Sequence, residues 1–446
     1  MARKIVIIGA HAAGTDAASA ARKTDRHAEI TLITDQDVAG YSPCGIPFVI
    51  GGHIPSFEDL IVFPPSYYRM MKLDLRLKTK AKKIDVENKT VEIEGKEGKT
   101  EVLEYDSLIL ATGAYPFVPP IRGRDKKGVY TLRTLEDGRI VNKALEKAKS
   151  AVVIGAGLIG LEAAVSFVER GLKTTVVELL PQVLPAMLDR DMARLVQKHL
   201  EEEGINIITD SGVDEILGDD HVSGVSVAGE EIPADLVIVA TGVRPNVQLA
   251  RDAGIEIGET GGIKTNMRME TSVKDVYAAG DCAESVNMIT KRPMASQLGT
   301  TAVRQGKVAG VNAAGGYAVF LGCLGSAVTK LLNLEIGVTG LTEYAAGRFG
   351  IETVVGSITS KTRADYYPGG KSIRVKIVVD KDTERIIGGQ IIGGEAVTQR
   401  INALSFAIQK QMTIRELAKA DTCYAPPVNE TWEPMVLAAE VAIRKL

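Results

Sequence analysis

Cysteine, histidine and aromatic residues are scarce in this sequence. It has four cysteines and five histidines among 446 residues, and aromatic side chains make up only 5% of it. The cysteines are far apart and form no C-x-x-C pair: Cys44, Cys282, Cys323 and Cys423. This number and spacing argue against structural disulfides and against a zinc site. We therefore expect no bound metal.

Long apolar runs and a strong charge imbalance are also missing. No stretch of 18 or more apolar residues occurs, so neither a transmembrane helix nor a signal peptide is expected. The formal net charge is only −3, which provides no basic field for nucleic acid or a membrane surface. These absences predict a cytoplasmic protein that binds neither.

Glycine, in contrast, is plentiful, with 45 residues, and it forms two turns that each join a strand to a helix. The second turn is a complete G-x-G-x-x-G made by Gly155, Gly157 and Gly160, and the next strand ends at Glu178. Such glycines let the backbone approach a pyrophosphate, and a carboxylate at that strand end accepts hydrogen bonds from ribose hydroxyls. Glu178 would repel a 2′-phosphate, so we expect this unit to bind NADH rather than NADPH.

The first turn is degenerate, because Gly9, His11 and Gly14 occupy the three glycine positions. The following strand ends near Asp35, so the ribose carboxylate is displaced or replaced. A later strand closes on Gly280-Asp281, where an aspartate can accept a ribityl hydroxyl of FAD. We therefore expect FAD in the first unit and NADH in the second.

The two units form an internal duplication, and each also contains an Ala-Thr-Gly segment, at 111–113 (Thr112, Gly113) and at 240–242 (Gly242). We predict an α/β fold with an FAD-binding domain (1–118 and 245–317), an NAD-binding domain (119–244) and a C-terminal α+β dimerisation domain (318–446). Segments 86–93 and 101–105 alternate as in an antiparallel hairpin. Beyond residue 318, strands at 373–379 and 386–392 precede a helix with apolar residues from Val397 to Met412. That helix could bury its apolar face against its own sheet or across a dimer.

Several motifs agree with one known family. They are Pro43-Cys44-Gly45-Ile46-Pro47, the two Ala-Thr-Gly segments, Gly242-Val243-Arg244-Pro245-Asn246, Ala278-Ala279-Gly280-Asp281, Tyr366-Tyr367-Pro368-Gly369-Gly370 and Tyr424-Ala425-Pro426-Pro427. In these motifs nearly the whole chain resembles the flavin-dependent pyridine nucleotide–disulfide oxidoreductases. The similarity is to the single-cysteine branch of coenzyme A disulfide reductases, CoA-persulfide (NAD(P)H sulfur) reductases and NADH oxidases.

The resemblance assigns Cys44 as the catalytic cysteine. Val49 stands where glutathione and lipoamide reductases carry a second cysteine, so the C-x4-C dithiol is absent. A disulfide at Cys44 must then be completed by a substrate, or Cys44 must cycle through an oxidised monothiol. The family places this cysteine at a helix N-terminus against the flavin, which implies a lowered pKa and thiolate character.

The resemblance also implies further site residues. Tyr367 and Tyr424 would lie near the partner subunit's cysteine and protonate a departing thiolate, or they would only cap an interface. Spacing does not decide between Tyr366 and Tyr367. Glu162 corresponds to the family's carboxylate near the nicotinamide. Arg22 and Ser42 are candidates for binding the CoA moiety, although Arg22 also fits an ordinary surface charge. His11 lies one residue before the histidine position of related peroxidases, so it is expected at the pyrophosphate turn.

The expected function is electron transfer from NADH through FAD to Cys44 and then to a low-molecular-weight disulfide or persulfide: CoA disulfide, CoA persulfide or polysulfide. The active sites would be shared between the subunits of a homodimer. Two alternatives stay open. One is an NADH oxidase that reduces O₂ at the flavin, and the other is a flavin reductase of a protein electron-transfer partner.

Overall fold

The computed structural model describes residues 2–446, apart from the side chain of residue 97. Its first sheet is entirely parallel, in the order β18-β7-β1-β2-β3. The strands are β1 (Lys4–Ile8), β2 (Glu29–Ile33), β3 (Asp74–Arg76), β7 (Ser107–Leu110) and β18 (Val276–Ala278). Because β18 follows the whole second unit in sequence, two distant segments complete one sheet.

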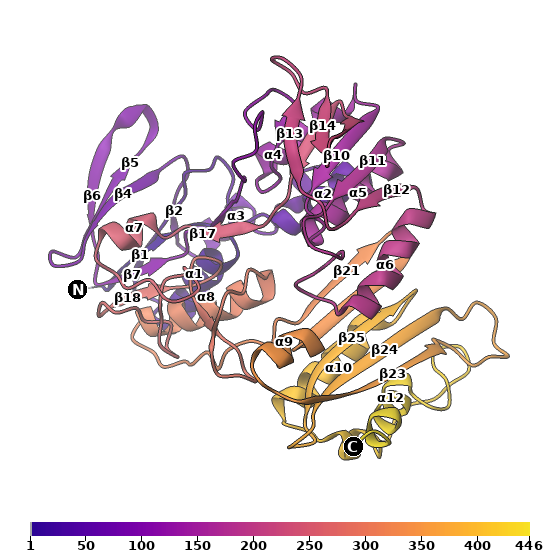
Figure 1. The fold of residues 1–446 in the computed structure, drawn as a ribbon. Coiled ribbons are helices and arrows are strands. Elements are labelled where there is room, and N and C mark those ends of the chain that lie inside the picture. The colour runs from indigo at the N-terminus through magenta and orange to yellow at the C-terminus, as the bar shows by residue number, and fades with distance from the viewer. Residues whose placement is uncertain (1) are drawn as a thin grey trace.

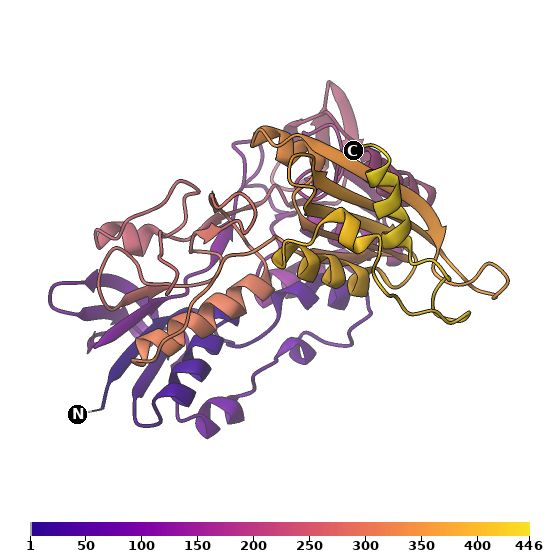
Figure 2. The ribbon, with the colours of Figure 1, turned by 90° about the horizontal axis from the view of Figure 1, so that it is seen from below.

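Helices α1 (Ala12–Thr24) and α8 (Gly299–Ala313) run side by side along this sheet (Figures 1 and 2). Small residues permit the contact: a Cβ at Gly306 or Gly310 would lie 2.2 or 2.1 Å from the carbonyl oxygens of Ala13 and Ala17. Glycine at both positions therefore sets how closely α1 packs.

A three-stranded antiparallel sheet follows, made of β4 (Lys80–Asp85), β5 (Thr90–Glu94) and β6 (Thr100–Glu104). The predicted hairpin is confirmed, but the prediction of one strand over 86–93 is wrong. Its first residues form a turn in which the Asp85 carboxylate accepts the N–H groups of Glu87 and Asn88, and Lys89 takes a φ of 51°. An aspartate that accepts hydrogen bonds from the next backbone amides ends a strand in this way.

The second unit repeats the architecture in a parallel sheet with the order β12-β11-β10-β16-β9. Its strands are β9 (Val129–Tyr130), β10 (Ser150–Ile154), β11 (Lys173–Val177), β12 (Ile205–Ile208) and β16 (Leu236–Val239). Its helices are α4 (Leu135–Leu145), α5 (Leu158–Glu169) and α6 (Arg190–Glu202), and an antiparallel sheet is added by β13 (Val213–Leu217), β14 (Gly224–Val227) and β15 (Glu230–Pro233). The predicted duplication is confirmed.

The chain enters and leaves the second unit through two paired strands, β8 (Ala114–Pro116) and β17 (Val243–Pro245). The threonines of the two Ala-Thr-Gly segments fasten this crossing. Thr112 Oγ1 donates to the Asn246 carbonyl and Thr241 Oγ1 to the Phe117 carbonyl, each at 2.6 Å. Their shared position in the two repeats therefore has a structural reason.

The C-terminal part is an antiparallel sheet in the order β21-β22-β25-β24-β23, with helices packed on it (Figure 1). The elements are β21 (Ala327–Leu331), β22 (Leu334–Gly340), β23 (Thr353–Lys361), β24 (Ser372–Asp380), β25 (Ile386–Gly393), α10 (Val397–Gln409) and α12 (Pro434–Ile443). Val397, Ile401 and Leu404 of α10 contact Gly337 and Gly389 of the sheet. The apolar face of α10 thus packs against its own sheet, and the helix ends before Met412.

Short elements complete the chain: 3-10 turns η1 (Pro43–Gly45), η2 (Glu58–Leu60) and η3 (Lys96–Gly98), helices α2 (Ile46–Ile50), α3 (Pro65–Met70), α7 (Gln248–Asp252), α9 (Glu343–Arg348) and α11 (Ile414–Leu417), and strands β19 (Ser285–Val286) and β20 (Pro293–Met294). Over residues 2–446, none of the helices has both the length and the apolar character needed to cross a membrane.

A buried charge cluster joins the second unit to the C-terminal sheet. Lys376 Nζ lies 3.1 Å from Asp189 Oδ2, 2.7 Å from Asp191 Oδ1 and 3.3 Å from Glu343 Oε2. The Gln390 amide both donates to Asp189 and accepts its N–H. Burial alone would raise the pKa of Asp189, but hydrogen bonds and the Lys376 charge lower it below its usual value. The cluster therefore depends on the one buried ammonium.

We expect Lys376→Met to destabilise the protein by about 3 kcal/mol or more, because it leaves the buried Asp189 carboxylate without its cation. The exposed Lys381–Glu352 pair offers a matched control. Lys381→Met should cost about 1 kcal/mol or less. Thermal and urea unfolding measure both, and equal losses would contradict this interpretation of the cluster.

Candidate active site

Cys44 lies in turn η1, directly before the short helix α2. Helix α2 is wedged against the second unit: the Ser166 hydroxyl of α5 donates to the Pro47 carbonyl at 2.7 Å, and Ile46 packs on Gly138 of α4. The Ser42 N–H donates to the Leu60 carbonyl and holds the start of the turn. Cys44 is exposed, so the fold presents this thiol at the junction of the two units.

Three charged side chains act on Cys44, and each comes from a different segment. Burial raises the pKa of the Cys44 thiol, and the Glu162 carboxylate raises it further. The Arg133 guanidinium acts in the opposite direction, and the Asp281 carboxylate again raises the pKa. In the chain by itself the net shift of this pKa is upward, and the lowered pKa that the resemblance implies for Cys44 against the flavin stays a prediction. The helix after Cys44 has only five residues, and the charges of two carboxylates, Glu162 and Asp281, raise the pKa of the thiol.

Glu162 is held by a residue from the C-terminal sheet. Thr329 Oγ1 of β21 donates to Glu162 Oε1 at 2.7 Å. Burial raises the pKa of Glu162, and this hydrogen bond partly opposes the shift. Glu162 lies in the first turns of α5, just after the second glycine-rich turn. Its charge also acts on the thiol of Cys44.

The second glycine-rich turn has the shape that a dinucleotide needs. Gly155 has a φ of 107°, and a Cβ there would lie 2.5 Å from the Ala240 carbonyl oxygen. A Cβ at Gly160 would lie 2.0 Å from the Gly155 carbonyl oxygen. A Cβ at Gly157 would meet nothing within 4 Å, which leaves open space at the N-terminus of α5. Open space beside free backbone amides fits a pyrophosphate group.

Glu178 is buried at the end of β11, beside this turn. Its Oε2 accepts the Ala156 N–H at 2.6 Å and its Oε1 accepts the Leu180 N–H at 2.8 Å. A carboxylate has about four acceptor positions, so capacity is left for ribose hydroxyls. The next residue, Leu179, is exposed, and neither it nor Leu180 supplies a cation for a 2′-phosphate.

The first turn is equally close-packed. A Cβ at Gly14 would lie 1.8 Å from the Gly9 carbonyl oxygen, and one at Gly9 would lie 2.0 Å from that of Ala111. His11 begins α1, and both its ring nitrogens are buried without a hydrogen-bond partner while its ring packs against Tyr41. Burial lowers the pKa of His11 to about 4. Unpartnered buried nitrogens at this turn fit a bound nucleotide better than a packed core.

The far side of the first site is formed by Gly280 and Asp281, which follow β18. Gly280 has a φ of 83°, and Asp281 Oδ2 accepts from the Arg133 guanidinium at 2.7 Å. Gly113, with a φ of 67°, lies beside the same guanidinium. Asp35 is exposed at the end of β2, where its hydrogen-bonding capacity is available. Arg133 thus connects Asp281 with Gly113, and the assignment of these positions and of Asp35 to FAD stays a prediction.

Arg133 and Thr329 are the two site residues that sequence reasoning missed. Arg133 precedes α4, whose start is marked by a capping box at Thr134 and Asp137. That signal locates the helix but says nothing about an arginine reaching Asp281. Thr329 lies in an ordinary strand of a different part of the chain, and no local pattern connects it with Glu162.

The tyrosines belong to the C-terminal part of the chain, whereas Cys44 belongs to turn η1 of the first unit. Tyr366 and Tyr424 share a hydrogen bond between their hydroxyls, whereas Tyr367 is the neighbour that was expected to act. Both Tyr366 and Tyr424 are exposed. The loop between β23 and β24, which carries Tyr366, extends away from the body of the chain (Figures 1 and 2). The structure therefore pairs Tyr424 with Tyr366, on a surface directed outward.

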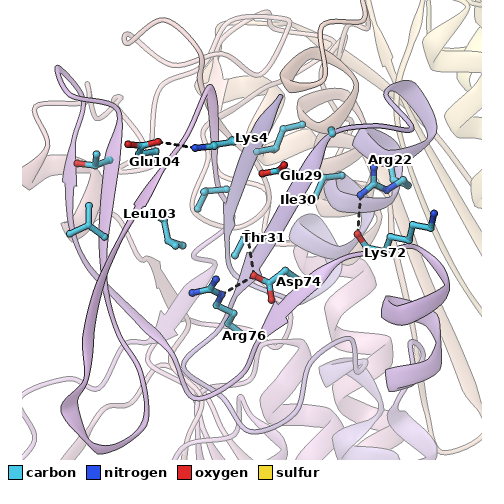
Figure 3. A pocket seen from close by; sticks show the side chains of 15 residues that line it. Lys4, Arg22, Glu29, Ile30, Thr31, Lys72, Asp74, Arg76, Leu103 and Glu104 are labelled. Atoms are coloured by element: carbon cyan, nitrogen blue, oxygen red, sulfur yellow. Dashed lines mark hydrogen bonds and ion pairs between the residues drawn. The ribbon is translucent and has the colours of Figure 1, made fainter. Parts of the chain in front are cut away.

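Arg22 lies at the opposite end of α1 from the first glycine-rich turn. Its guanidinium donates to four backbone carbonyls, those of Asp25, Arg26, Met71 and Lys72. It lines a hollow of about 760 Å³ between β1–β3 and β6, and Figure 3 shows two ion pairs on its walls, Lys4–Glu104 and Arg76–Asp74. Arg22 therefore ties α1 to the segment before β3, and the assignment of Arg22 and Ser42 to substrate binding stays a prediction.

Metal-binding and disulfide sites are not found. Among the described residues, no group of three or more histidine, cysteine, aspartate or glutamate side chains could hold a metal ion. Cys282 and Cys323 are buried and Cys423 is exposed, and all four thiols are free.

Comparison with known proteins places this geometry in a family. The model of the pyridine nucleotide-disulphide oxidoreductases matches residues 3–306, and the model of their dimerisation domain matches residues 326–436. The chain belongs to the pyridine nucleotide-disulphide oxidoreductases. It is an FAD-dependent enzyme that oxidises a nicotinamide nucleotide.

Individual relatives span almost the whole chain. An NADH oxidase of Methanocaldococcus jannaschii is 47% identical, with 99% of each chain covered. A CoA-dependent NAD(P)H sulfur oxidoreductase of Pyrococcus abyssi is 38% identical, with 98% of each chain covered. The solved structure of an NAD-dependent persulfide reductase from A. fulgidus matches with a TM-score of 0.97 at 39% identity, covering 99% of this chain and 83% of that one.

We expect Glu178→Ala to weaken the discrimination between NADH and NADPH. A carboxylate about 4 Å from a 2′-phosphate costs about 1–4 kcal/mol, so the ratio of kcat/KM for NADH over NADPH should fall about tenfold or more. Glu203→Ala, at an exposed position beyond α6, serves as the control. Steady-state kinetics with both nucleotides measure the ratio, and an unchanged ratio would show that Glu178 has no part in the selection.

Proposed function

We propose that this enzyme passes electrons from NADH through FAD to Cys44, and from there to a low-molecular-weight disulfide or persulfide such as CoA disulfide, CoA persulfide or polysulfide. The observation that carries the proposal is the position of Cys44. It is the one exposed thiol at the junction of the two nucleotide units, and buried Val49 replaces a second cysteine. A mixed disulfide with a substrate is then the available route for sulfur chemistry.

In this proposal different residues bind the two cofactors and react with the substrate. Gly155, Gly157 and Gly160 would hold the NADH pyrophosphate, and Asp281 with the first turn would hold FAD, which accepts a hydride and supplies two electrons for reduction of sulfur. Cys44, as a thiolate, attacks one sulfur of the substrate disulfide, forms a mixed disulfide and releases one thiol. Reduction of this mixed disulfide then releases the second thiol. The net reaction is NADH + H⁺ + RSSR → NAD⁺ + 2 RSH.

Cys44 must lose a proton before it attacks, and its surroundings raise its pKa. Glu162 is a carboxyl group that also binds its proton more tightly than usual because it is buried. The resemblance places Glu162 beside the nicotinamide, so we infer that Glu162 acts on that side of the flavin, whereas Cys44 reacts on the other side.

A second function is supported by the 47% identity with the M. jannaschii NADH oxidase. In that alternative, O₂ takes the electrons and Cys44 is oxidised or is not required. Both functions share the nucleotide sites, and they differ in their dependence on the thiol.

Replacement of Cys44 separates the two functions. We expect Cys44→Ser to abolish reduction of CoA disulfide and persulfide, by about 10⁴-fold or more, because the attacking nucleophile is removed. Bleaching of the flavin by NADH under anaerobic conditions should persist. Oxygen consumption should also persist if O₂ is reduced at the flavin. Cys282→Ser, at a buried thiol, is the control, and a Cys44→Ser protein that reduces CoA disulfide at the native rate would refute the proposal.

We also propose a homodimer whose active sites are shared. The match to a dimerisation domain supports the dimer. Several large apolar side chains of the C-terminal part are exposed and therefore available for contact with a second copy: Tyr366, Tyr367, Phe406, Tyr424, Val428 and Trp432. A two-fold dimer would bring the Tyr366–Tyr424 pair of one subunit to Cys44 of the other. A phenol there can protonate the departing thiolate.

Subunit complementation tests this arrangement. Tyr424→Phe should lower sulfur reduction by about 10²- to 10⁴-fold if the phenol is a general acid. In a dimer with one Cys44→Ser and one Tyr424→Phe subunit, one site has both defects and the other has neither. Random co-expression should therefore restore about a quarter of the native activity. Recovery of none, with hybrid dimers demonstrated by tagged purification, would place both residues in the same subunit's site.

A further inference from the structure

The two segments that carry Tyr366 and Tyr424 are joined to each other within the chain. Tyr424 lies in an irregular segment between α11 and α12, and Tyr366 lies in the loop between β23 and β24. Their hydroxyls share a hydrogen bond, and the Ala364 N–H donates to the Pro426 carbonyl at 3.2 Å. Side chains and backbone thus hold the two segments together in the single chain.

An arginine of α10 fastens the Tyr424 segment from the interior. Arg400 Nε donates to Glu433 Oε1 at 2.6 Å, and Arg400 Nη2 donates to Glu433 Oε2 at 3.1 Å. The same Nη2 donates to Asn429 Oδ1 at 2.8 Å, and Asn429 Nδ2 donates to the Cys423 carbonyl at 3.0 Å. The Arg400 and Glu433 side chains are only 8% and 7% exposed. A buried cation therefore reaches, through one amide side chain, the backbone directly before Tyr424.

A second arginine–glutamate pair fastens the β23–β24 loop to the start of α10. Arg363 Nε and Nη2 donate to Glu395 Oε1 and Oε2, each at 3.0 Å, and Thr362 Oγ1 donates to Glu395 Oε1 at 2.6 Å. Glu395 directly precedes Ala396, whose carbonyl accepts from Arg400 Nη1 at 3.1 Å. Both tyrosine segments are therefore anchored at one place, the junction of β25 and α10.

A buried ion pair is a costly way to stabilise a fold, because both charges lose their contact with water. Apolar side chains of similar size often stabilise a core equally well. What a bidentate arginine provides in addition is direction, since its planar donors fix both the position and the orientation of the carboxylate that they bind. The Arg400–Glu433 pair thus suits the placement of a segment that has no helix or strand of its own.

The proposed function requires such placement. A phenol protonates a thiolate only from hydrogen-bond distance, and a small displacement weakens catalysis strongly. We propose that Arg400 is a positioning residue of the sulfur-reducing site: through Glu433 and Asn429 it holds the Tyr424 phenol in the place from which it acts at Cys44 of the other subunit. This inference rests on the proposed function. Arg400 acts through Tyr424 and itself transfers no proton.

The test uses the full-length, flavin-loaded protein with CoA disulfide as the acceptor. Arg400→Lys keeps the charge but loses the bidentate geometry. Asn429→Ala leaves the Arg400–Glu433 pair in place and removes the link to Cys423, so it carries the comparison if Arg400→Lys does not fold. We expect each variant to lower kcat about 10- to 100-fold, because the phenol is displaced. Anaerobic bleaching of the flavin by NADH should be unchanged, because that step precedes the sulfur chemistry.

The measurement that isolates positioning is made in the Tyr424→Phe background. If Arg400 acts through the phenol, Arg400→Lys and Asn429→Ala should each change kcat less than about twofold in a protein that already lacks the phenol. Losses that instead multiply would overturn the proposal, since they reveal an effect independent of Tyr424. A native kcat in both single variants, or in Tyr424→Phe itself, would overturn it as well.

Hydrogen–deuterium exchange provides a readout that needs no turnover. In Arg400→Lys and Asn429→Ala the backbone amides of residues 421–429 and 362–371 should exchange faster than in the native protein, because their common anchor is weakened. Native exchange of these amides in both variants would contradict the proposal.

Arg415→Lys is the matched control, because Arg415 forms a similar bidentate pair with Glu384 at an exposed position. It should leave both kcat and the exchange of residues 421–429 unchanged. Failure of the proposed function would be seen separately, as CoA disulfide reduction that persists in Cys44→Ser.

Discussion

The packing of the short helix α2 against α5 is the contact on which the site depends. The hydrogen bond from the Ser166 hydroxyl to the Pro47 carbonyl, with Ile46 packed on Gly138, fixes a turn of the first unit against two helices of the second. Cys44 immediately precedes this contact. This small interface therefore sets the distances from the Cys44 sulfur to the two nucleotide sites. Substitutions at Ser166 or Gly138 would affect the reaction by changing these distances.

Burial and the charges around Cys44 together raise the pKa of its thiol and do not activate it. Two carboxylates raise the pKa of the thiol, and Arg133, which also forms the ion pair with Asp281, opposes them. Activation of the thiol therefore has to come from the bound flavin and substrate.

The C-terminal sheet contributes to the site in two separate ways. Within the chain it reaches the nucleotide unit through Thr329, which holds Glu162, and through the buried Lys376 cluster, which fixes the start of α6. Outward it carries the Tyr366–Tyr424 pair on an exposed apolar surface. A dimer formed on that surface would place both contributions at the same reaction centre, one from each subunit.

The sequence by itself determined what is local. Glycines at Gly9, Gly155 and Gly160 are required because a Cβ would collide with the neighbouring backbone, and the strand–turn–helix order around them defines both nucleotide units. The predicted parallel sheets, the duplication and the positions of Cys44 and Asp281 follow from such patterns. One strand boundary was misplaced: the hydrogen bonds of the Asp85 side chain hold residues 86–89 in a turn, so β5 begins later than residue alternation indicates.

Only the tertiary structure decided what depends on contacts between distant segments. Arg133 and Asp281 are 148 residues apart, and Thr329 and Glu162 are 167 apart. No local spacing encodes such pairs, because long side chains reach in directions that packing alone selects. For the same reason the chain pairs Tyr424 with Tyr366 rather than Tyr367, Arg22 is occupied by backbone carbonyls, and the pKa of Cys44 is raised. The pKa of a site residue depends on the charges and the burial that all neighbouring segments of the folded chain contribute.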